Sequence, residues 1–305
     1  MNSLFRRTFY RCMFFTPWLL TASAMANDQS RVDSPPSFTQ VLPQVKTLQG
    51  QVQGQISLAV MASDGAWLWH YQGQTSVALM STFKPFACAK LLNDFEQGRV
   101  SKEHKVMVEA DTLQAYSPVA KDWLNQAVSY QQACEATLRT SDNTAANIVL
   151  EGIGGPQGLT GFFRDIGDNR SRLDDIEPKL NQVALGETNN TSHAIALVQS
   201  LQRLTFGRVL TTGSQEQLLT WMKANQVSDN LLRASLPEGW RIADRSGAGK
   251  QGDRGIIAVV WPDNTGGYSQ PVIMAIYIQH AKADMAQLDQ AIAAIGASLF
   301  NVMLN

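Results

Sequence analysis

The sequence predicts an α/β (α+β) fold in which both chain ends form one antiparallel sheet, with flanking helices and an inserted all-α domain. Segments rich in β-branched and aromatic residues occur at residues 55–72 and again beyond Gly239. Between them, apolar residues recur close to the helical period. This order places two domains side by side, and we expect the functional site in the cleft between them.

The first part of the sheet is predicted from two neighbouring segments. Residues 55–63 and 66–72 have strand composition, and Ser63-Asp64-Gly65 joins them as a hairpin turn. A polar, proline-bearing leader at residues 27–39 precedes them. We assign residues 27–78 to the sheet domain.

The helical domain is predicted to span residues 79–223 and to begin with a helix at Ser81. Apolar residues follow Ser81 at helical spacing, Pro85 is tolerated in a first helical turn, and Gly98 is placed to end the helix. Residues 172–190 lack periodicity and are predicted to form a loop. Further helices are predicted at residues 117–124, 129–140, 144–152, 156–166, 192–206 and 214–224.

Strand composition returns in the last part of the chain. Residues 240–244, 256–261 and 272–279 are predicted strands separated by glycine-bearing turns, and residues 283–304 are a predicted helix. Residues 224–305 therefore complete the sheet domain.

The N-terminus has the organisation of a secretory signal peptide, to which we assign residues 1–26. Arginines at positions 6, 7 and 11 precede an apolar run, and Ala24-Met25-Ala26 offers a small-x-small cleavage site. The run is too short, and too interrupted by Pro17, to span a bilayer as a helix. The alternative is an uncleaved buried helix. We expect export to the periplasm and no membrane attachment after signal removal.

Composition and cysteine count limit the partners. The 305 residues carry a net charge of −1 and 17% charged residues, which suits a globular protein and gives no indication of nucleic-acid binding. Cys12 would leave with the signal. Cys88 and Cys134 remain and predict one disulfide, with two separate buried thiols as the alternative. No His or Cys cluster has metal-ligand spacing, so we expect no metal and no cofactor.

Ser81 and Lys84 are three residues apart at the start of the first predicted helix. In a helix, side chains at this spacing leave the same face. A serine hydroxyl needs a neighbouring base to become a nucleophile, and a desolvated lysine can serve as one. The pair is therefore a candidate acyl-transfer site, although a helix cap followed by a solvated lysine gives the same pattern.

Two other motifs have structural alternatives of their own. Ser141-Asp142-Asn143 lies between two predicted helices and offers a hydroxyl to pass a proton and an amide to bind a substrate amide, or it is simply a helix N-cap. Arg245-Ser246-Gly247 follows a predicted strand and offers a cation and a hydroxyl, or it is a surface turn.

The loop at residues 172–190 carries a candidate water-binding pair. Glu177 and Asn181 can hold one water between them, with the carboxylate removing its proton and the amide fixing its position. The alternative is a solvated glutamate in a turn.

These pieces together resemble the class A serine β-lactamases over nearly the whole mature chain. Four motifs occur in the family's order and at its spacings: Ser-Thr-Phe-Lys at 81–84, Ser-Asp-Asn at 141–143, Glu-x-x-x-Asn at 177–181 and Arg-Ser-Gly at 245–247. Further matches are Tyr116-Ser117-Pro118-Val119, the cysteine pair Cys88 and Cys134, and Asp253-Arg254-Gly255. An arginine in the last motif is similar to the carbenicillinase subgroup.

The resemblance implies a role for each catalytic residue. Ser81 would attack the lactam carbonyl while its own N–H and that of Ala248 stabilise the oxyanion. Lys84, or Glu177 through a water, would take the serine proton, and Ser141 would relay a proton to the lactam nitrogen.

The resemblance also implies how the substrate is held and released. Asn143 would bind the side-chain amide, Tyr116 would line the cleft edge, and Ser246 with Arg245 and Arg254 would hold the carboxylate. Glu177 and Asn181 would supply the water that hydrolyses the acyl-enzyme.

The implied function is hydrolysis of the β-lactam amide bond of penicillins, with carboxypenicillins and some early cephalosporins as further candidates, conferring antibiotic resistance. The substrate is a small molecule, and one site per chain makes a monomer adequate. The alternatives are a penicillin-binding D,D-peptidase or transpeptidase, a β-lactam sensor that stays acylated, and a β-lactamase of the carbamylated-lysine class.

The chain departs from the family pattern in the loop. Many relatives clamp it with an ion pair at positions that here hold Asp175 and Asn190. Either another contact, for example through Arg172, holds the loop, or the loop is looser than usual.

Overall fold

The central element is a five-stranded antiparallel sheet whose strand order is β2-β1-β9-β8-β7. The computed structural model describes residues 35–263 and 267–305. The sheet's strands are β1 Gln55–Ala62, β2 Leu68–Tyr71, β7 Arg241–Ala248, β8 Arg254–Trp261 and β9 Val272–Gln279. Strand β1 pairs with β9 from Gln55↔Gln279 to Ala62↔Val272, so the two chain ends do share one sheet. The predicted fold class is confirmed.

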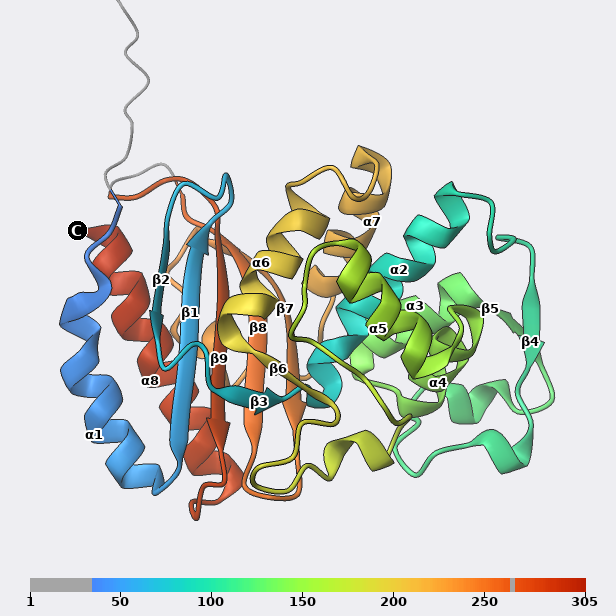
Figure 1. Cartoon of the computed structure of the whole chain (residues 1–305), viewed down its shortest axis with the longest axis horizontal. Coiled ribbons are helices and arrows are strands. Elements are labelled where there is room, and N and C mark those ends of the chain that lie inside the picture. Colours follow the sequence, from blue (N-terminus) through green and yellow to red (C-terminus); the bar gives the residue numbers. More distant parts are fainter. Residues whose placement is uncertain (1–34, 264–266) are drawn as a thin grey trace, which may run out of the picture. The chain divides into compact units, whose positions relative to one another are not determined.

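Alternate side chains of the sheet enter two different cores, as the period of a strand requires. In β9, Ile273, Ala275 and Tyr277 pack with the helical segment between the two sheet halves. Their neighbours in β9 face the other way and pack with Phe38 and the C-terminal helix. Figure 1 shows α1 and α8 on one side of the sheet and α6 on the other. The near-continuous apolar composition of β9 follows from burial on both faces.

Eight α-helices occur in the described residues: α1 Leu42–Val52, α2 Lys84–Glu96, α3 Tyr130–Thr140, α4 Asn143–Gly152, α5 Gly155–Asp165, α6 Ala194–Thr205, α7 Thr212–Lys223 and α8 Met285–Leu304. Seven of them match predicted helices. Helix α1 was not predicted, because only Val45 and Val52 of it are buried and its other side chains are largely polar. Within residues 35–263 and 267–305, no helix is long and apolar enough to span a membrane.

One predicted helix is wrong. Residues 117–124 contain only a 3-10 turn, Ala120–Trp123, and its buried residue is Ala120 alone. A residue distant in the sequence determines the conformation of this segment: the Asp142 carboxylate accepts hydrogen bonds from the backbone N–H groups of Val119 and Ala120 at 2.9 and 2.8 Å.

Four three-residue strands were also not predicted: β3 Ser76–Ala78 pairs with β6 Thr191–His193, and β4 Lys105–Met107 pairs with β5 Ala127–Ser129. Segments this short cannot display an alternating pattern. Strand β6 occupies the start of the predicted helix at 192–206, so helix α6 begins at Ala194.

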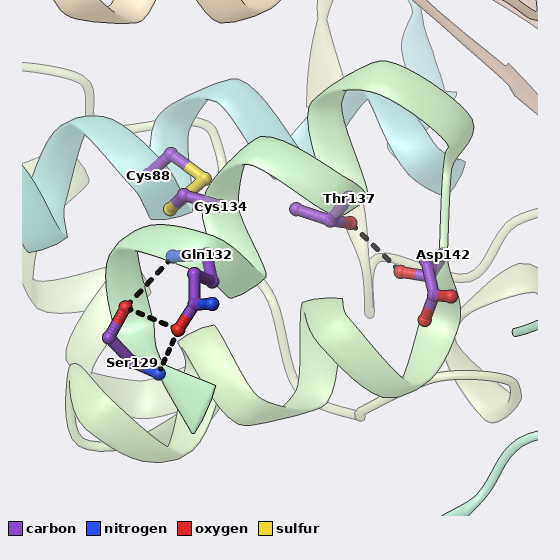
Figure 2. Close-up of a disulfide and its surroundings, with 6 residues drawn as sticks. All are labelled: Cys88, Ser129, Gln132, Cys134, Thr137 and Asp142. Atoms are coloured by element: carbon purple, nitrogen blue, oxygen red, sulfur yellow. Dashed lines mark hydrogen bonds between the residues drawn. A yellow bond between two sulfur atoms is a disulfide. The ribbon is translucent and has the colours of Figure 1, made fainter. Parts of the chain in front are cut away.

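Helices α2 and α3 are joined covalently, as Figure 2 shows. Cys88 of α2 and Cys134 of α3 form the predicted disulfide, with their Cα atoms 5.6 Å apart. Helix α3 starts with a capping box between Ser129 and Gln132, which satisfies two backbone N–H groups at its N-terminus. The disulfide and the cap hold the helix that leads into Ser141.

The predicted signal peptide and most of the leader lie outside the described residues. The division into a sheet domain at 27–78 and 224–305 and a helical domain at 79–223 stays a prediction.

Candidate active site

Ser81 lies on a tight turn before the helix rather than inside it. The 3-10 segment Met80–Phe83 runs directly into α2, which begins at Lys84 with Pro85 in its first turn. The preceding residue, Met80, is fully buried and has a φ of +49°, a conformation that costs free energy in a residue with a side chain. Helical geometry on both sides of Lys84 still directs Ser81 and Lys84 to the same face, as predicted.

Lys84 is fully buried and its ammonium is surrounded by oxygen atoms. Its Nζ donates to the Ser141 carbonyl at 2.9 Å, to Ser141 Oγ at 3.1 Å and to Asn143 Oδ1 at 2.8 Å. Burial lowers the pKa of Lys84 to about 8, although the nearby Glu177 carboxylate opposes this shift. The amine therefore has an appreciable neutral fraction near physiological pH.

The motif at 141–143 combines a structural and a chemical role. Asp142 is the N-cap of α4 and accepts the N–H of Ala145 at 2.8 Å, while Thr137 Oγ1 donates to the Asp142 carbonyl (Figure 2). Ser141 ends α3 with a φ of +63°, and its Oγ donates to Ser81 Oγ at 3.1 Å. The N-cap alternative is thus correct for Asp142, while Ser141 and Asn143 face Lys84.

Glu177 is 1% exposed, which contradicts the alternative of a solvated loop glutamate. Its Oε1 lies 3.1 Å from Lys84 Nζ and accepts Ser81 Oγ at 3.4 Å. The backbone of Glu177 is held by the Asn147 amide, which donates to its carbonyl at 3.0 Å and accepts from its N–H at 2.9 Å. Two contact networks therefore fix this carboxylate against the nucleophile.

Asn181 lies beside the same carboxylate. Its Nδ2 donates to Glu177 Oε2 at 2.6 Å. Its Oδ1 is buried and has no hydrogen-bond partner within residues 35–263 and 267–305. A carboxylate oxygen and a buried acceptor side by side form an arrangement suited to hold a water between them.

Strand β7 forms the opposite wall of the site. The predicted strand at 240–244 extends to Ala248, so Arg245, Ser246 and Gly247 lie within it rather than in a surface turn. A Cβ at Gly247 would lie 2.7 Å from Met80 Cβ and 2.8 Å from the Ser81 backbone nitrogen. Only glycine allows the strand to approach the nucleophile this closely.

The two arginines differ in how they are held. Arg245 is 1% exposed and donates to the carbonyls of Ser246 and Leu138 at 3.0 and 3.3 Å. Burial lowers the pKa of Arg245 to about 10, which leaves it charged. Arg254 is paired with Asp289 at 2.6 Å and donates to the Gly247 carbonyl at 3.2 Å.

One pocket brings together most of the predicted site residues. Tyr116 is half exposed at its rim, and the Asn143 N–H donates to the Tyr116 carbonyl at 2.9 Å. Lys84 and Glu177 do not line this pocket, but they contact Ser141, Ser81 and Asn181, which do. The pocket is lined by Ser81, Tyr116, Ser141, Asn143, Asn181, Val227, Arg245, Ser246, Gly247, Ala248 and Arg254.

Hydrogen bonds at Asp175 and Asn190 hold the loop at 172–190. Asn190 Oδ1 accepts the N–H groups of Asp174 and Asp175 at 2.9 Å each, and Asn190 Nδ2 donates to Asp175 Oδ2 at 2.9 Å. Arg172 pairs with Asp174, whose carboxylate also accepts the Asn190 N–H at 3.0 Å. The two residues that depart from the family pattern thus bind each other directly.

Sequence reasoning missed two polar side chains that support the site. Asn147 lies four residues after Asn143 on α4, and this one-face spacing of two amides was a usable signal. Asn225 follows α7 and accepts Arg245 Nη1 at 3.2 Å, but no pattern in the sequence indicated it. Within the described ranges, no three His, Cys, Asp or Glu side chains are grouped as metal ligands would be.

Comparison with known proteins identifies the family of the chain. The model of a family described as the β-lactamase enzyme family matches residues 41–303. The chain belongs to this family. Its relatives include β-lactamases CARB-3 and PSE-1 of Pseudomonas aeruginosa, which are 45% and 44% identical to it over 265 residues. These matches span 87% of this β-lactamase-family chain and 91% of each relative.

Solved β-lactamase structures share the fold. The chromosome-encoded β-lactamase of Vibrio parahaemolyticus superposes with a TM-score of 0.82 at 39% identity, covering 86% of this chain and 98% of that one. An ancestral class A β-lactamase superposes with a TM-score of 0.82 at 34% identity, covering 86% and 99%. The class A resemblance inferred from the motifs is confirmed.

Proposed function

We propose that this β-lactamase-family chain hydrolyses the amide bond of penicillins through an acyl-enzyme on Ser81. The observation that carries the proposal is the position of Glu177, whose carboxylate lies 3.4 Å from Ser81 Oγ and 2.6 Å from Asn181 Nδ2. A group so placed serves the release of an acyl-enzyme as well as its formation.

In the acylation step, Ser81 Oγ forms a bond to the lactam carbonyl carbon, and the N–H groups of Ser81 and Ala248 stabilise the oxyanion. Neutral Lys84, or Glu177 through a water, takes the serine proton. Glu177 Oε1 lies 3.4 Å from Ser81 Oγ, and Lys84 Nζ is linked to Ser81 Oγ through the Ser141 hydroxyl. The C–N bond of the lactam then breaks, and Ser141 passes a proton to the leaving nitrogen. Its hydroxyl links Ser81 Oγ at 3.1 Å to Lys84 Nζ at 3.1 Å, as such a relay requires.

In the deacylation step, a water between Glu177 and Asn181 attacks the ester carbonyl. Glu177 removes the water's proton while Asn181 Oδ1 fixes the water's orientation. The ester bond to Ser81 then breaks, and the proton that Glu177 took from the water passes to Ser81 Oγ. The hydrogen bonds and the ion pair around Lys84 are thereby restored for the next cycle.

The pocket wall suits an anionic substrate with an amide side chain. Asn143 would bind the side-chain amide and Tyr116 would line the cleft edge, while Ser246, Arg245 and Arg254 would hold the ring carboxylate. A planar guanidinium at position 245 also supports the use of carboxypenicillins, and the same pocket would accept some early cephalosporins.

Turnover and protein mass together test this function. Purified mature protein is mixed with benzylpenicillin or a chromogenic cephalosporin, and product and intact mass are followed over time. We expect multiple turnovers and only transient acylation of Ser81. Stoichiometric acylation that persists would instead identify a penicillin-binding peptidase, a transpeptidase or a sensor, and turnover that survives loss of Glu177 would favour the carbamylated-lysine class.

We further propose that the chain acts as a periplasmic monomer and confers penicillin resistance. The basic, apolar and small-x-small organisation of residues 1–26 supports export. Expression of the full chain in a Gram-negative host should give a periplasmic protein that begins at Asn27 and raises the inhibitory concentration of penicillin. Retention of residues 1–26 or a cytoplasmic product would contradict the proposed location.

A further inference from the structure

A buried amide connects helix α7 to the cation of the active site. Asn225 is 4% exposed and follows the C-terminus of α7. Its Oδ1 accepts Arg245 Nη1 at 3.2 Å and the Val227 N–H at 3.1 Å. Its Nδ2 donates to Asp244 Oδ1 at 2.5 Å and to Ser228 Oγ at 2.7 Å. Both ends of the amide are fully used, which allows only one orientation of the group.

The same amide reaches the second carboxylate-binding side chain through Ser228. Ser228 is fully buried and its Oγ donates to Ser246 Oγ at 2.9 Å. Because Ser228 donates the hydrogen bond between the two hydroxyls, the Ser246 hydroxyl donates its own proton to a different acceptor. Its present acceptor is the Val227 carbonyl at a long 3.4 Å. The Ser246 proton is therefore free to turn toward an anionic substrate at little cost.

Asn225 also separates Arg245 from the nearest acidic side chain. In the described part of the chain, Arg245 takes part in no ion pair. The neighbouring Asp244 carboxylate is instead bound by Arg233, whose Nε and Nη2 lie 2.9 and 3.2 Å from its oxygens. The neutral amide lies between the two charged groups and hydrogen-bonds to both. The positive charge of Arg245 is thus left for a ligand.

We propose that Asn225 is a positioning residue that orders Arg245 directly, and Ser246 through Ser228, to bind the carboxylate of the substrate. The inference rests on the proposed function, in which this carboxylate belongs to a penicillin. Asn225 sets the affinity for the anion in the ground state and the transition state alike, so its loss should raise KM and leave kcat nearly unchanged.

The variant Asn225→Asp tests the proposal through its pH profile. The new carboxylate would lie within hydrogen-bond distance of Asp244, and two carboxylates that close cannot both ionise readily. The charged groups facing position 225 are Asp244 and Arg245 of β7 and Arg233 of the 3-10 segment Leu232–Ser235. At acidic pH the shared proton makes position 225 resemble an amide. As the pH rises, the second carboxylate ionises beside Arg245 and competes with the substrate.

We expect the KM of Asn225→Asp for benzylpenicillin to approach that of the wild type at acidic pH and to rise about tenfold or more toward alkaline pH, the scale of a one-unit pKa shift. The ratio to the wild type is taken at each pH. The variant Asn225→Leu, which has no charge to titrate, should show a KM raised about 10- to 100-fold at every pH, because a hydrogen bond to a charged group is lost. The control Asn301→Asp adds the same charge at an exposed position on α8 and should leave KM unchanged.

The variant Ser228→Ala keeps the test decisive if the Asn225 variants do not fold. It removes the link to Ser246 and one of the two acceptors of Asn225 Nδ2, while the bond from Arg245 to Asn225 Oδ1 stays in place. A raised KM with unchanged kcat supports the proposal. Wild-type KM values in Ser228→Ala and, where it folds, in Asn225→Asp at every pH would overturn it. Absence of turnover by the wild type would refute the proposed function instead; the second-order rate of Ser81 acylation, read by mass, would then replace KM in the same comparison.

Discussion

The two segments that meet at Ser81 are held in different ways. The turn and helix that carry Ser81 and Lys84 are packed by apolar contacts, since Met80, Phe83 and Phe86 have no exposed surface. The loop that carries Glu177 also buries Leu173, Leu180 and Val183, but a network of amides and carboxylates holds the segment around Glu177, where Ile176 is 48% exposed. The nucleophile is therefore positioned mainly by apolar packing, whereas the Glu177 carboxylate is positioned mainly by hydrogen bonds.

This difference separates the two halves of the reaction. Apolar packing is lost only when the core opens, so acylation of Ser81 should be lost only under conditions that unfold the domain. Hydrogen bonds of the loop can be removed one at a time, each for about 1 kcal/mol, without unfolding the domain. Deacylation should therefore respond to substitutions that acylation and stability tolerate.

The largest expected effect is on deacylation in Glu177→Gln. The amide keeps the shape of the side chain but cannot remove a proton from water, so deacylation should slow by about 10² to 10⁴. An acyl-enzyme on Ser81 should accumulate, as intact-mass spectrometry after rapid mixing with benzylpenicillin would detect. Fast deacylation in this variant would mean that Glu177 does not activate the water.

The acylation rate of the same variant against pH identifies the base. Without Glu177 only Lys84 remains to take the Ser81 proton, so the rate should rise about tenfold per pH unit below the pKa of Lys84 and then level off. Since Glu177 raises the Lys84 pKa, the break should move below the value of about 8 in the intact site. Stopped-flow acylation measures this profile. Acylation too slow to measure at any pH would assign the base role to Glu177.

Loss of the disulfide should lower the stability of the segment that carries Ser81 and Lys84 and leave the deacylation rate unchanged. In the entropic model, Cys88→Ala with Cys134→Ala removes about 4 kcal/mol, and the Tm should fall by roughly 10 °C. The bridge closes a loop over a sequence separation of 46 and joins the helices that carry Lys84 and lead to Ser141. Thermal unfolding and single-turnover deacylation at 25 °C are measured on one preparation. A large fall in the deacylation rate at 25 °C, together with the fall in Tm, would contradict the separation of the two regions.

Removal of the contact between Asn190 and Asp175 should give the opposite pattern. Asn190→Ala leaves two backbone N–H groups without their acceptor, and deacylation should slow by about tenfold. Because the loop can open locally and expose these groups to water, the Tm should fall by less than in the disulfide variant. Lys179→Ala is the matched control, because it breaks an ion pair of the same loop in which the lysine side chain is 75% exposed. Equal effects of the two variants would show that Asn190 has no special part in holding Glu177.

The smallest effect is expected for Arg245→Lys. The charge stays but the fork geometry is lost, so the ratio of kcat/KM for carbenicillin to that for benzylpenicillin should fall by a few-fold, about the 1 kcal/mol that such geometry contributes. Steady-state kinetics on both substrates measure the ratio. An unchanged ratio would remove the link between this arginine and carboxypenicillins.

The sequence was informative where a pattern repeats and uninformative where a contact depends on the finished fold. Period and composition located the five long strands and seven helices, and four motifs located the residues that surround the pocket. Helix α1 and the three-residue strands were missed because their apolar signal is weak or too short. The segment 117–124 was predicted as a helix on its local pattern, whereas the Asp142 carboxylate determines its shape.

The loop and the supporting amides illustrate the same limit. Sequence comparison with the family pattern indicated that Asp175 and Asn190 cannot form the usual ion pair, but not that they bind each other. Nor did the sequence indicate that Asn147 and Asn225 hold Glu177 and Arg245. The spacing from Asn143 could have placed Asn147 on the same face of α4, but the partners of both amides lie far away along the chain.

The close approach of Gly247 to Ser81 limits how this pocket can evolve. Beside Ser81, Gly247 faces Met80 Cβ and the main chain of Met80 and Ser81, and glycine itself has no side chain that a substitution could shorten. A bulkier substrate therefore has to gain its room at the rim, where Tyr116 and Val227 border the opening, or from a displaced loop. Changes in antibiotic spectrum should accumulate at those positions and leave the glycine untouched.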